Sequence, residues 1–115
     1  MATVKINLEN YRSEDQVRHI KSKVFTGRDR GQEVREQSKI DELEADNDEI
    51  IIEIPADIYS INPSFFEELF INVVAKLKKE AFFSKFKLDP KGDYDFQDEL
   101  MEAIDRILND ATAIG

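Results

Sequence analysis

The chain has 115 residues, of which 41% are hydrophobic, and this is enough to enclose one core, so we expect a single domain over residues 1–115. Asp and Glu number 25 against 16 Lys and Arg, and the net charge of -9 would repel nucleic-acid phosphates. There is no Cys and His19 is the single histidine, which excludes disulfides and thiolate metal sites and disfavours zinc. We read no signal peptide and no apolar run of about 20 residues, and therefore expect a cytoplasmic protein without a membrane segment.

The N-terminal region is predicted to contain one regular strand and one ambiguous segment. Apolar and polar residues alternate over residues 3–8, which predicts a half-buried strand at or near a sheet edge. Ser13 and Gln16 have the spacing of a capping box, and apolar residues then recur at helical spacing. This pattern predicts a short helix over residues 14–22, and a strand over residues 19–25 is the alternative.

A basic segment bounded by two glycines follows, with the sequence Gly-Arg-Asp-Arg-Gly. It lacks the Gly-Lys-Ser/Thr ending of a P-loop and the third glycine of a dinucleotide-binding turn. A helix is predicted over residues 31–45, so backbone amides at its start could hold an anion together with an arginine. A helix start with solvated arginines is the simpler interpretation, and both stay open. The candidate anion-binding residues are Gly27, Arg28, Arg30 and Gly31.

The densest apolar pattern lies between residues 50 and 77. Ile50 to Ile54 is almost continuously β-branched, which predicts a strand covered on both faces, and Pro55 ends it. Large apolar residues then recur at helical spacing, which predicts a long helix packed on the sheet. Ser64 and Glu67 have capping-box spacing, so Ser64 is predicted to be the N-cap of this helix.

Two further elements are predicted near the C-terminus. Phe86 and Leu88 alternate with lysines, which predicts a strand, and Asp95 can cap a final helix with one apolar face. Strands and helices therefore alternate along the chain. This order predicts an α/β fold with a mixed sheet of about four strands, helices packed on it, and parallel pairing through right-handed connections.

No catalytic arrangement can be identified from the sequence. His19 lies among cations, with Asp15 as its one acidic neighbour, and Ser64 lacks both a base and the glycines of a nucleophile elbow. The aspartates of residues 89–98 lack the glycine and the final glutamate of a calcium loop. We therefore predict a protein that is not an enzyme and that uses neither a metal nor a cofactor.

Ile50 to Ile54, followed by Ile58 to Phe70, resembles the STAS-like domain family. This bacterial and phage-associated family of unknown function is a distant relative of the sulfate-transporter and anti-sigma-antagonist domains. Its pattern is an apolar strand, a turn and helix of the type Ile-Ser-Pro-Ser-Phe-Ala-Asp-Glu-Leu-Phe, and a strand rich in Lys and Phe, which residues 82–88 fit. Residues 27–35 resemble a Gly-Arg-x-x-Gly-x-x-Val-Arg start of the preceding helix. The similarity spans roughly residues 25–108 and implies a small STAS-like domain.

The resemblance also implies a regulatory role. In the anti-sigma-antagonist relatives, an ATPase related to histidine kinases phosphorylates a serine in the turn between strand and helix, and this switches binding. Ser64 corresponds by position to that serine and Asn62 to the acidic residue before it. Pro63 and Phe65 replace the first serine and the glycine of the relatives' motif.

We therefore predict a protein-interaction or regulatory module that acts as a partner switch with an ATP-binding, kinase-like protein. Ser64 is the candidate phosphorylation site. One alternative is a small-ligand or nucleotide sensor that binds an anion at residues 27–31. The other is a structural subunit that forms homodimers through apolar residues of the outer helices. The predicted docking residues are Tyr59, Asn62, Ser64, Glu67, Glu68 and Asn72.

Overall fold

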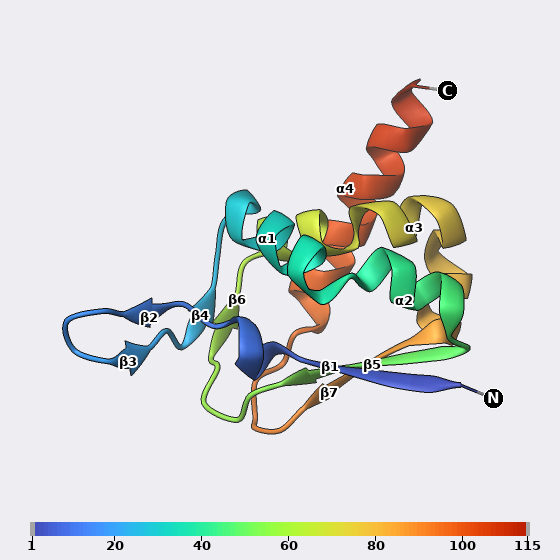
Figure 1. The fold of residues 1–115 in the computed structure, drawn as a ribbon. Coiled ribbons are helices and arrows are strands. Elements are labelled where there is room, and N and C mark those ends of the chain that lie inside the picture. The colour runs from blue at the N-terminus through green and yellow to red at the C-terminus, as the bar shows by residue number, and fades with distance from the viewer. Residues whose placement is uncertain (1, 115) are drawn as a thin grey trace.

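Three parallel strands form the main sheet, in the order β1–β5–β7 (Figure 1). The computed structural model describes residues 2–114, and their side chains except those of Asp15 and residues 110–114. β1 (Thr3–Asn7) and β7 (Phe86–Pro90) lie on either side of β5 (Glu49–Ile54), which confirms the strand predicted from the isoleucine run and the edge position of the first strand. The predicted α/β class is confirmed.

Helices cover one face of this sheet (Figure 1). Ile50, Ile52 and Ile54 are fully buried, whereas Ile51 and the glutamates of β5 are partly exposed. The prediction that this strand is covered on both faces is therefore wrong. Ile51 lies in register with the exposed Lys5 and Lys87 of the two neighbouring strands. These lysines make the uncovered face of the sheet polar beside Ile51, which the sequence of β5 alone does not indicate.

The helix predicted over residues 31–45 is two helices, α1 (Arg28–Ser38) and α2 (Ile40–Asp46). Lys39 separates them, because its φ of 57° is left-handed and ends the first helix. α1 begins three residues earlier than predicted, directly after Gly27, whose φ of 89° favours glycine.

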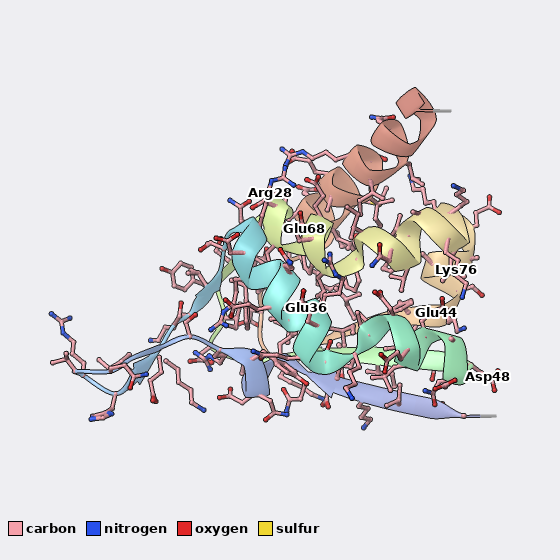
Figure 2. All side chains as sticks on the ribbon, turned by 45° about the horizontal axis from the view of Figure 1, so that its top comes forward. Arg28, Glu36, Glu44, Asp48, Glu68 and Lys76 are labelled. Atoms are coloured by element: carbon pink, nitrogen blue, oxygen red, sulfur yellow. The ribbon has the colours of Figure 1, made fainter. Side chains whose placement is uncertain are left out.

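The long helix α3 (Pro63–Lys85) contains most of the apolar residues that predicted it, and it extends into the stretch expected to lead into the last strand. It bends at Lys78, where φ is 67° and ψ is 177°. The carboxylate of Glu44, 3% exposed, lies 2.9 Å from Nζ of Lys76 before the bend and 2.8 Å from Nζ of Lys85 after it. Figure 2 shows Glu44 and Lys76 facing each other between α2 and α3.

Phenylalanines of α3 form the centre of the core. Phe70 lies between Phe66, at 5.8 Å between ring centroids, and Phe82, at 5.1 Å, and Phe82 stacks on Phe86 of β7 at 4.8 Å. α4 (Gln97–Ile114) packs against α3, with Asp95 accepting a hydrogen bond from the amide of Gln97 as the predicted cap requires. Fully burying such side chains contributes about 2 kcal/mol each.

Residues 8–25 contain no α-helix, so the helix predicted over 14–22 is wrong. A 3₁₀ turn, η1 (Leu8–Tyr11), leads into β2 (Glu14–Asp15), which pairs with β3 (Ile20–Lys21) in an antiparallel hairpin. The carbonyl of Ser13 accepts the amide of Ser22 at 2.7 Å, so Ser13 closes a hairpin instead of capping a helix. This hairpin, which we call the arm (residues 13–23), projects from the helical body (Figure 1).

A second parallel pair joins the base of the arm to the start of α3. β4 (Val24–Phe25) pairs with β6 (Ser60–Ile61), which stands apart from the main sheet. The strands predicted to form one mixed sheet are thus divided between this pair, the arm and the three-stranded sheet. Part of the alternative strand over residues 19–25 is present as β3 and β4.

Candidate functional site

The N-terminus of α3 is capped by Asn62. Its Oδ1 accepts the amide of Ser64 at 2.9 Å and the hydroxyl of Ser64 at 2.7 Å. The prediction of Ser64 as N-cap is therefore wrong by two positions. Pro63 is the physical reason, because its fixed φ and missing amide suit the first helical position and place the cap before it. Ser64 is half-buried, with its hydroxyl engaged as a donor.

Glu67 and Glu68 are occupied by arginines of the same chain. Glu67, 6% exposed at its side chain, accepts two hydrogen bonds from Arg28, at 3.0 and 3.3 Å, and lies 3.7 Å from Arg106. Glu68 pairs with Arg35 at 3.2 Å, and Arg35 also donates to the Glu68 carbonyl. These carboxylates hold α1 and α4 against α3, and a partner would have to displace the arginines to use them.

The two segments that the sequence singled out lie side by side. Arg28 opens α1 and reaches Glu67 and Glu68 of α3, 39 and 40 positions along the chain, as the labelled Arg28 and Glu68 show (Figure 2). Gly31 is buried against this helix, because an added Cβ would stand 2.6 Å from the carbonyl oxygen of Phe65. The candidate anion segment and the candidate docking segment therefore form one region.

The predicted anion-binding residues border a cavity of about 690 Å³, except for Gly31, which faces α3. Arg30 donates to Oγ of Ser13 and pairs with Glu33 at 2.9 Å. Asp29 and Glu33 line the same cavity and offset the positive charge. The residues around this cavity are Ser13, Thr26, Gly27, Arg28, Asp29, Arg30 and Glu33.

The other predicted docking residues are exposed. Asn72 donates to Asp41 at 2.8 Å and joins α3 to α2. Tyr59 is 68% exposed, and its amide donates to the carbonyl of Lys23 at 3.0 Å. Tyr59 therefore lies at the base of the arm, whereas Asn72 lies on α3 beside Asp41 of α2.

Two further exposed apolar residues were missed by sequence reasoning. Val17 is 87% exposed and Ile20 is 56% exposed, and both are on the arm. Ile20 and Tyr59 line a cavity of about 450 Å³ together with polar and charged residues of the arm. The apolar residues of this segment match helical spacing, so they were assigned to the buried face of a helix. On a projecting hairpin they have no core to pack on and remain exposed. We call Val17, Ile20 and Tyr59, with the neighbouring Arg18, Lys21 and Lys23, the arm face.

Arg12 fixes the base of the arm. Its guanidinium donates to the Ser22 carbonyl at 3.0 and 2.8 Å and to the carboxylates of Glu9 and Asp57, each at 2.9 Å. The hydrogen bond from Arg12 lowers the pKa of Asp57, and bonds from Lys21 and Arg12 lower the pKa of Glu9. Both carboxylates are thus held in their charged form, which strengthens the attachment.

Tyr94 completes the pairing of β6. Its hydroxyl accepts the amide of Ile61 at 3.0 Å and donates to the carbonyl of the same residue at 3.3 Å. Burial raises the pKa of Tyr94, so the hydroxyl remains a donor. β6, which leads into the turn before α3, is therefore hydrogen-bonded both to β4 and to Tyr94.

Within residues 2–114, apart from the side chains of Asp15 and residues 110–114, no group of three or more His, Asp or Glu side chains is arranged to hold a metal ion. In the same range, no helix has the length and apolar character required to cross a bilayer.

No family model, no curated protein and no solved structure matches the chain. The resemblance to STAS-like domains therefore stays a prediction from the sequence, and function has to be argued from the surfaces described above.

Proposed function

We propose that this protein is a non-enzymatic protein-interaction module whose partner docks on the arm face. One observation carries the proposal: the exposed large apolar side chains of the described residues, Val17, Ile20 and Tyr59, all belong to this one end of the molecule. Clustered apolar side chains surrounded by polar residues are typical of protein-binding surfaces. Most large apolar residues of α3, in contrast, are buried in the core.

The arm face is connected to the candidate phosphorylation site through the backbone. β4 joins the arm to β6, and the amide of Asn62 donates to the carbonyl of Phe25 at 2.8 Å. A phosphate on Ser64 would remove the hydroxyl donor that now binds Asn62 and would add a charge of about -1.5 to -2 at the start of α3. This connection supports a partner-switching role with an ATP-binding, kinase-like protein, in which modification of Ser64 changes binding at the arm face.

Site-specific photo-crosslinking tests the docking surface. A benzoylphenylalanine at position 20 or 59, in a lysate of the source cells, should give one discrete crosslinked product that mass spectrometry identifies as the same protein from both positions. Position 79, exposed on the far half of α3, is the matched control. Equal crosslinking from position 79, or different products from positions 20 and 59, would show that the arm face is not the docking surface.

Phosphorylation needs its own test. The protein is incubated with ATP and a candidate ATP-binding, kinase-like partner, and phosphosites are mapped by mass spectrometry, with Ser64→Ala as the control. A phosphate on Ser64 that changes the crosslinking yield from position 59 supports the switch. Phosphate at another residue, or none, rules out this form of regulation.

Two other functions are distinguished by simple measurements. The anion sensor is favoured by the cavity that Arg28 and Arg30 border, and it requires phosphate or nucleotides to raise the melting temperature, with the increase lost in Arg30→Gln. The homodimer is favoured by an apolar cavity of about 310 Å³ between β7 and α4, and light scattering would detect its doubled mass. The residues around that cavity are Phe83, Phe86, Lys87, Leu88, Phe96, Gln97, Leu100 and Met101.

A further inference from the structure

We propose that Lys78 is a hinge at which α3 straightens, and that the straight form is a dimer in which two copies exchange the part of the chain that follows this residue. The φ of 67° and ψ of 177° at Lys78 lie in a region that only glycine adopts without strain. The side chain of Lys78 is exposed, and residues 75–81 are Ala, Leu, Lys and Glu, all strong helix formers. The bend therefore opposes the local preference of the chain, which favours one continuous helix.

Contacts between the two sides of the hinge hold the bend in place. Phe82 packs on Phe70 at 5.1 Å between ring centroids, and Nζ of Lys85 lies 2.8 Å from the carboxylate of Glu44. β7 pairs with β5 along its whole length, and Arg106 of α4 lies 3.7 Å from Glu67. A chain that straightened α3 by itself would lose these contacts.

A second copy of the chain can restore all of them. Each contact joins a residue before Lys78 to a residue after it, so residues 79–109 of a second copy could occupy the same places. The register of the sheet and the aromatic core would be unchanged, and only Lys78 would change, from a strained conformation to a helical one. A short hinge under strain is the condition that favours exchange between identical chains.

This dimer differs from one formed by surface association. The apolar cavity between β7 and α4 is lined by residues 83–101, which all lie after the hinge, so exchange moves this cavity as a unit and does not need to cover it. The arm lies before the hinge. Failure of the exchange would therefore leave the proposed docking on the arm face untouched.

Refolding from urea tests the role of the hinge, because exchange requires β7 and α4 to detach first. The protein is refolded at about 5 and about 500 µM, since dimer formation follows mass action, and the dimer fraction is measured by size exclusion with light scattering. We expect a dimer at the higher concentration. Lys78→Gly should lower the dimer fraction at least 5-fold, because glycine adopts the bend without strain and disfavours the straight helix.

Two control variants separate strain from charge and from helix propensity. Lys78→Ala removes the charge but keeps the strain and the helix propensity, so it should dimerise at least as well as the wild type. Lys79→Gly places glycine at an exposed position that is helical in both forms, so its dimer fraction should stay within twofold of the wild type. The urea midpoint of the monomer should fall in Lys79→Gly and not in Lys78→Gly.

Engineered disulfides identify the exchange itself, since the natural chain has no Cys. Ile51→Cys/Lys87→Cys places two thiols on register partners of β5 and β7, one on each side of the hinge. Adjacent strands lie about 4.8 Å apart, which a disulfide can bridge. The oxidised dimer should run as two linked chains on a non-reducing gel, whereas the monomer closes the same bond within one chain. Lys5→Cys/Ile51→Cys, on register partners that both precede the hinge, should give a bond within one chain in either form.

Three results would overturn the proposal. A wild type that stays monomeric at the higher concentration excludes the exchange. A dimer whose bond between positions 51 and 87 stays within one chain is formed by surface association instead. Equal dimer fractions, or equal losses in urea midpoint, for Lys78→Gly and Lys79→Gly would show that strain at Lys78 does not drive the exchange.

Discussion

The guanidinium of Arg12 binds the carboxylate of Asp57 through two hydrogen bonds of 2.9 Å, although 45 positions separate the two residues. The side chain of Arg12 is 4% exposed and also donates twice to the Ser22 carbonyl. One buried cation thus joins the arm to the loop that precedes Tyr59, and it fixes the two halves of the arm face relative to each other.

Arg12→Lys should loosen the arm while the body stays folded. Lysine keeps the charge but cannot form the planar fork that reaches Asp57 and Ser22 together, so we expect a loss of about 1–2 kcal/mol in unfolding free energy. Amides of residues 13–23 should exchange at least 10-fold faster in hydrogen-exchange mass spectrometry. Arg106→Lys, which changes an arginine on α4, is the control and should leave exchange in the arm unchanged. Arm exchange that is unaltered in Arg12→Lys would contradict the anchoring role.

Gly31→Ala should separate α1 from α3. The new Cβ would lie 2.6 Å from the Phe65 carbonyl oxygen and 2.8 Å from Cβ of Glu68, and a backbone atom can move away only if the helices shift. Overpacking of this kind costs about 1–3 kcal/mol, which urea unfolding measures. Gln37→Ala, at an exposed position of the same helix, should change stability by less than about 0.5 kcal/mol. Equal midpoints for the two variants would show that the close contact is not required.

Asn62→Ala should destabilise the protein more than Ser64→Ala does. Asn62 provides the acceptor for the free amide of Ser64, and losing an N-cap costs about 1 kcal/mol. Ser64→Ala removes only a hydroxyl whose partner, Asn62, still binds the amide. Thermal unfolding of both variants checks the order, and a larger loss for Ser64→Ala would restore Ser64 as the cap.

Glu44 should contribute to acid sensitivity. Burial by itself would raise the pKa of Glu44, but hydrogen bonds from Lys85 and Lys76 outweigh it and hold the pKa below its ordinary value of 4.5. Because the folded pKa is the lower one, this stabilisation is complete above about pH 4.5 and is lost as the pH falls through the folded pKa. Glu44→Gln should cost about 2 kcal/mol at pH 7, less than a fully buried pair because Lys76 is solvated.

Urea unfolding between pH 3 and 7 provides the measurement for Glu44→Gln. The gap between wild type and variant should narrow as the pH falls below 4.5. Glu42→Gln, at an exposed position of α2, is the control and should follow the wild type at every pH. A gap that stays constant down to pH 3 would contradict the lowered pKa.

Elements with dense apolar periodicity could be predicted from the sequence. β5 and α3 were found because Ile50 to Ile54 and Phe65 to Leu77 repeat at the periods of a buried strand and a helix. Residues 14–22 were misassigned because Val17 and Ile20 match helical spacing by accident. Both are exposed on a hairpin, so their spacing does not indicate a buried helix face.

The candidate site was harder to predict because its contacts are distant in sequence. Nothing near Glu67 indicates that Arg28 and Arg106 will occupy it, since they lie on α1 and α4. The cap, however, could have been predicted from Pro63, because proline prefers the first helical position and this places the N-cap at Asn62. The arm face could not be found from spacing, because Tyr59 is brought to Ile20 by contacts distant in sequence, which are the pairing of β4 with β6 and the hydrogen bond from the Tyr59 amide to the Lys23 carbonyl.

The bend of α3 at Lys78 gives this helix two axes, and Glu44 binds one lysine from each. Rotation of one half against the other would lengthen at least one of the two ion pairs, so the contact with α2 favours the observed angle between the axes. Phe70 lies before the bend and Phe82 after it, with ring centroids 5.1 Å apart, so the bend lets the two halves of one helix pack against each other in the aromatic core.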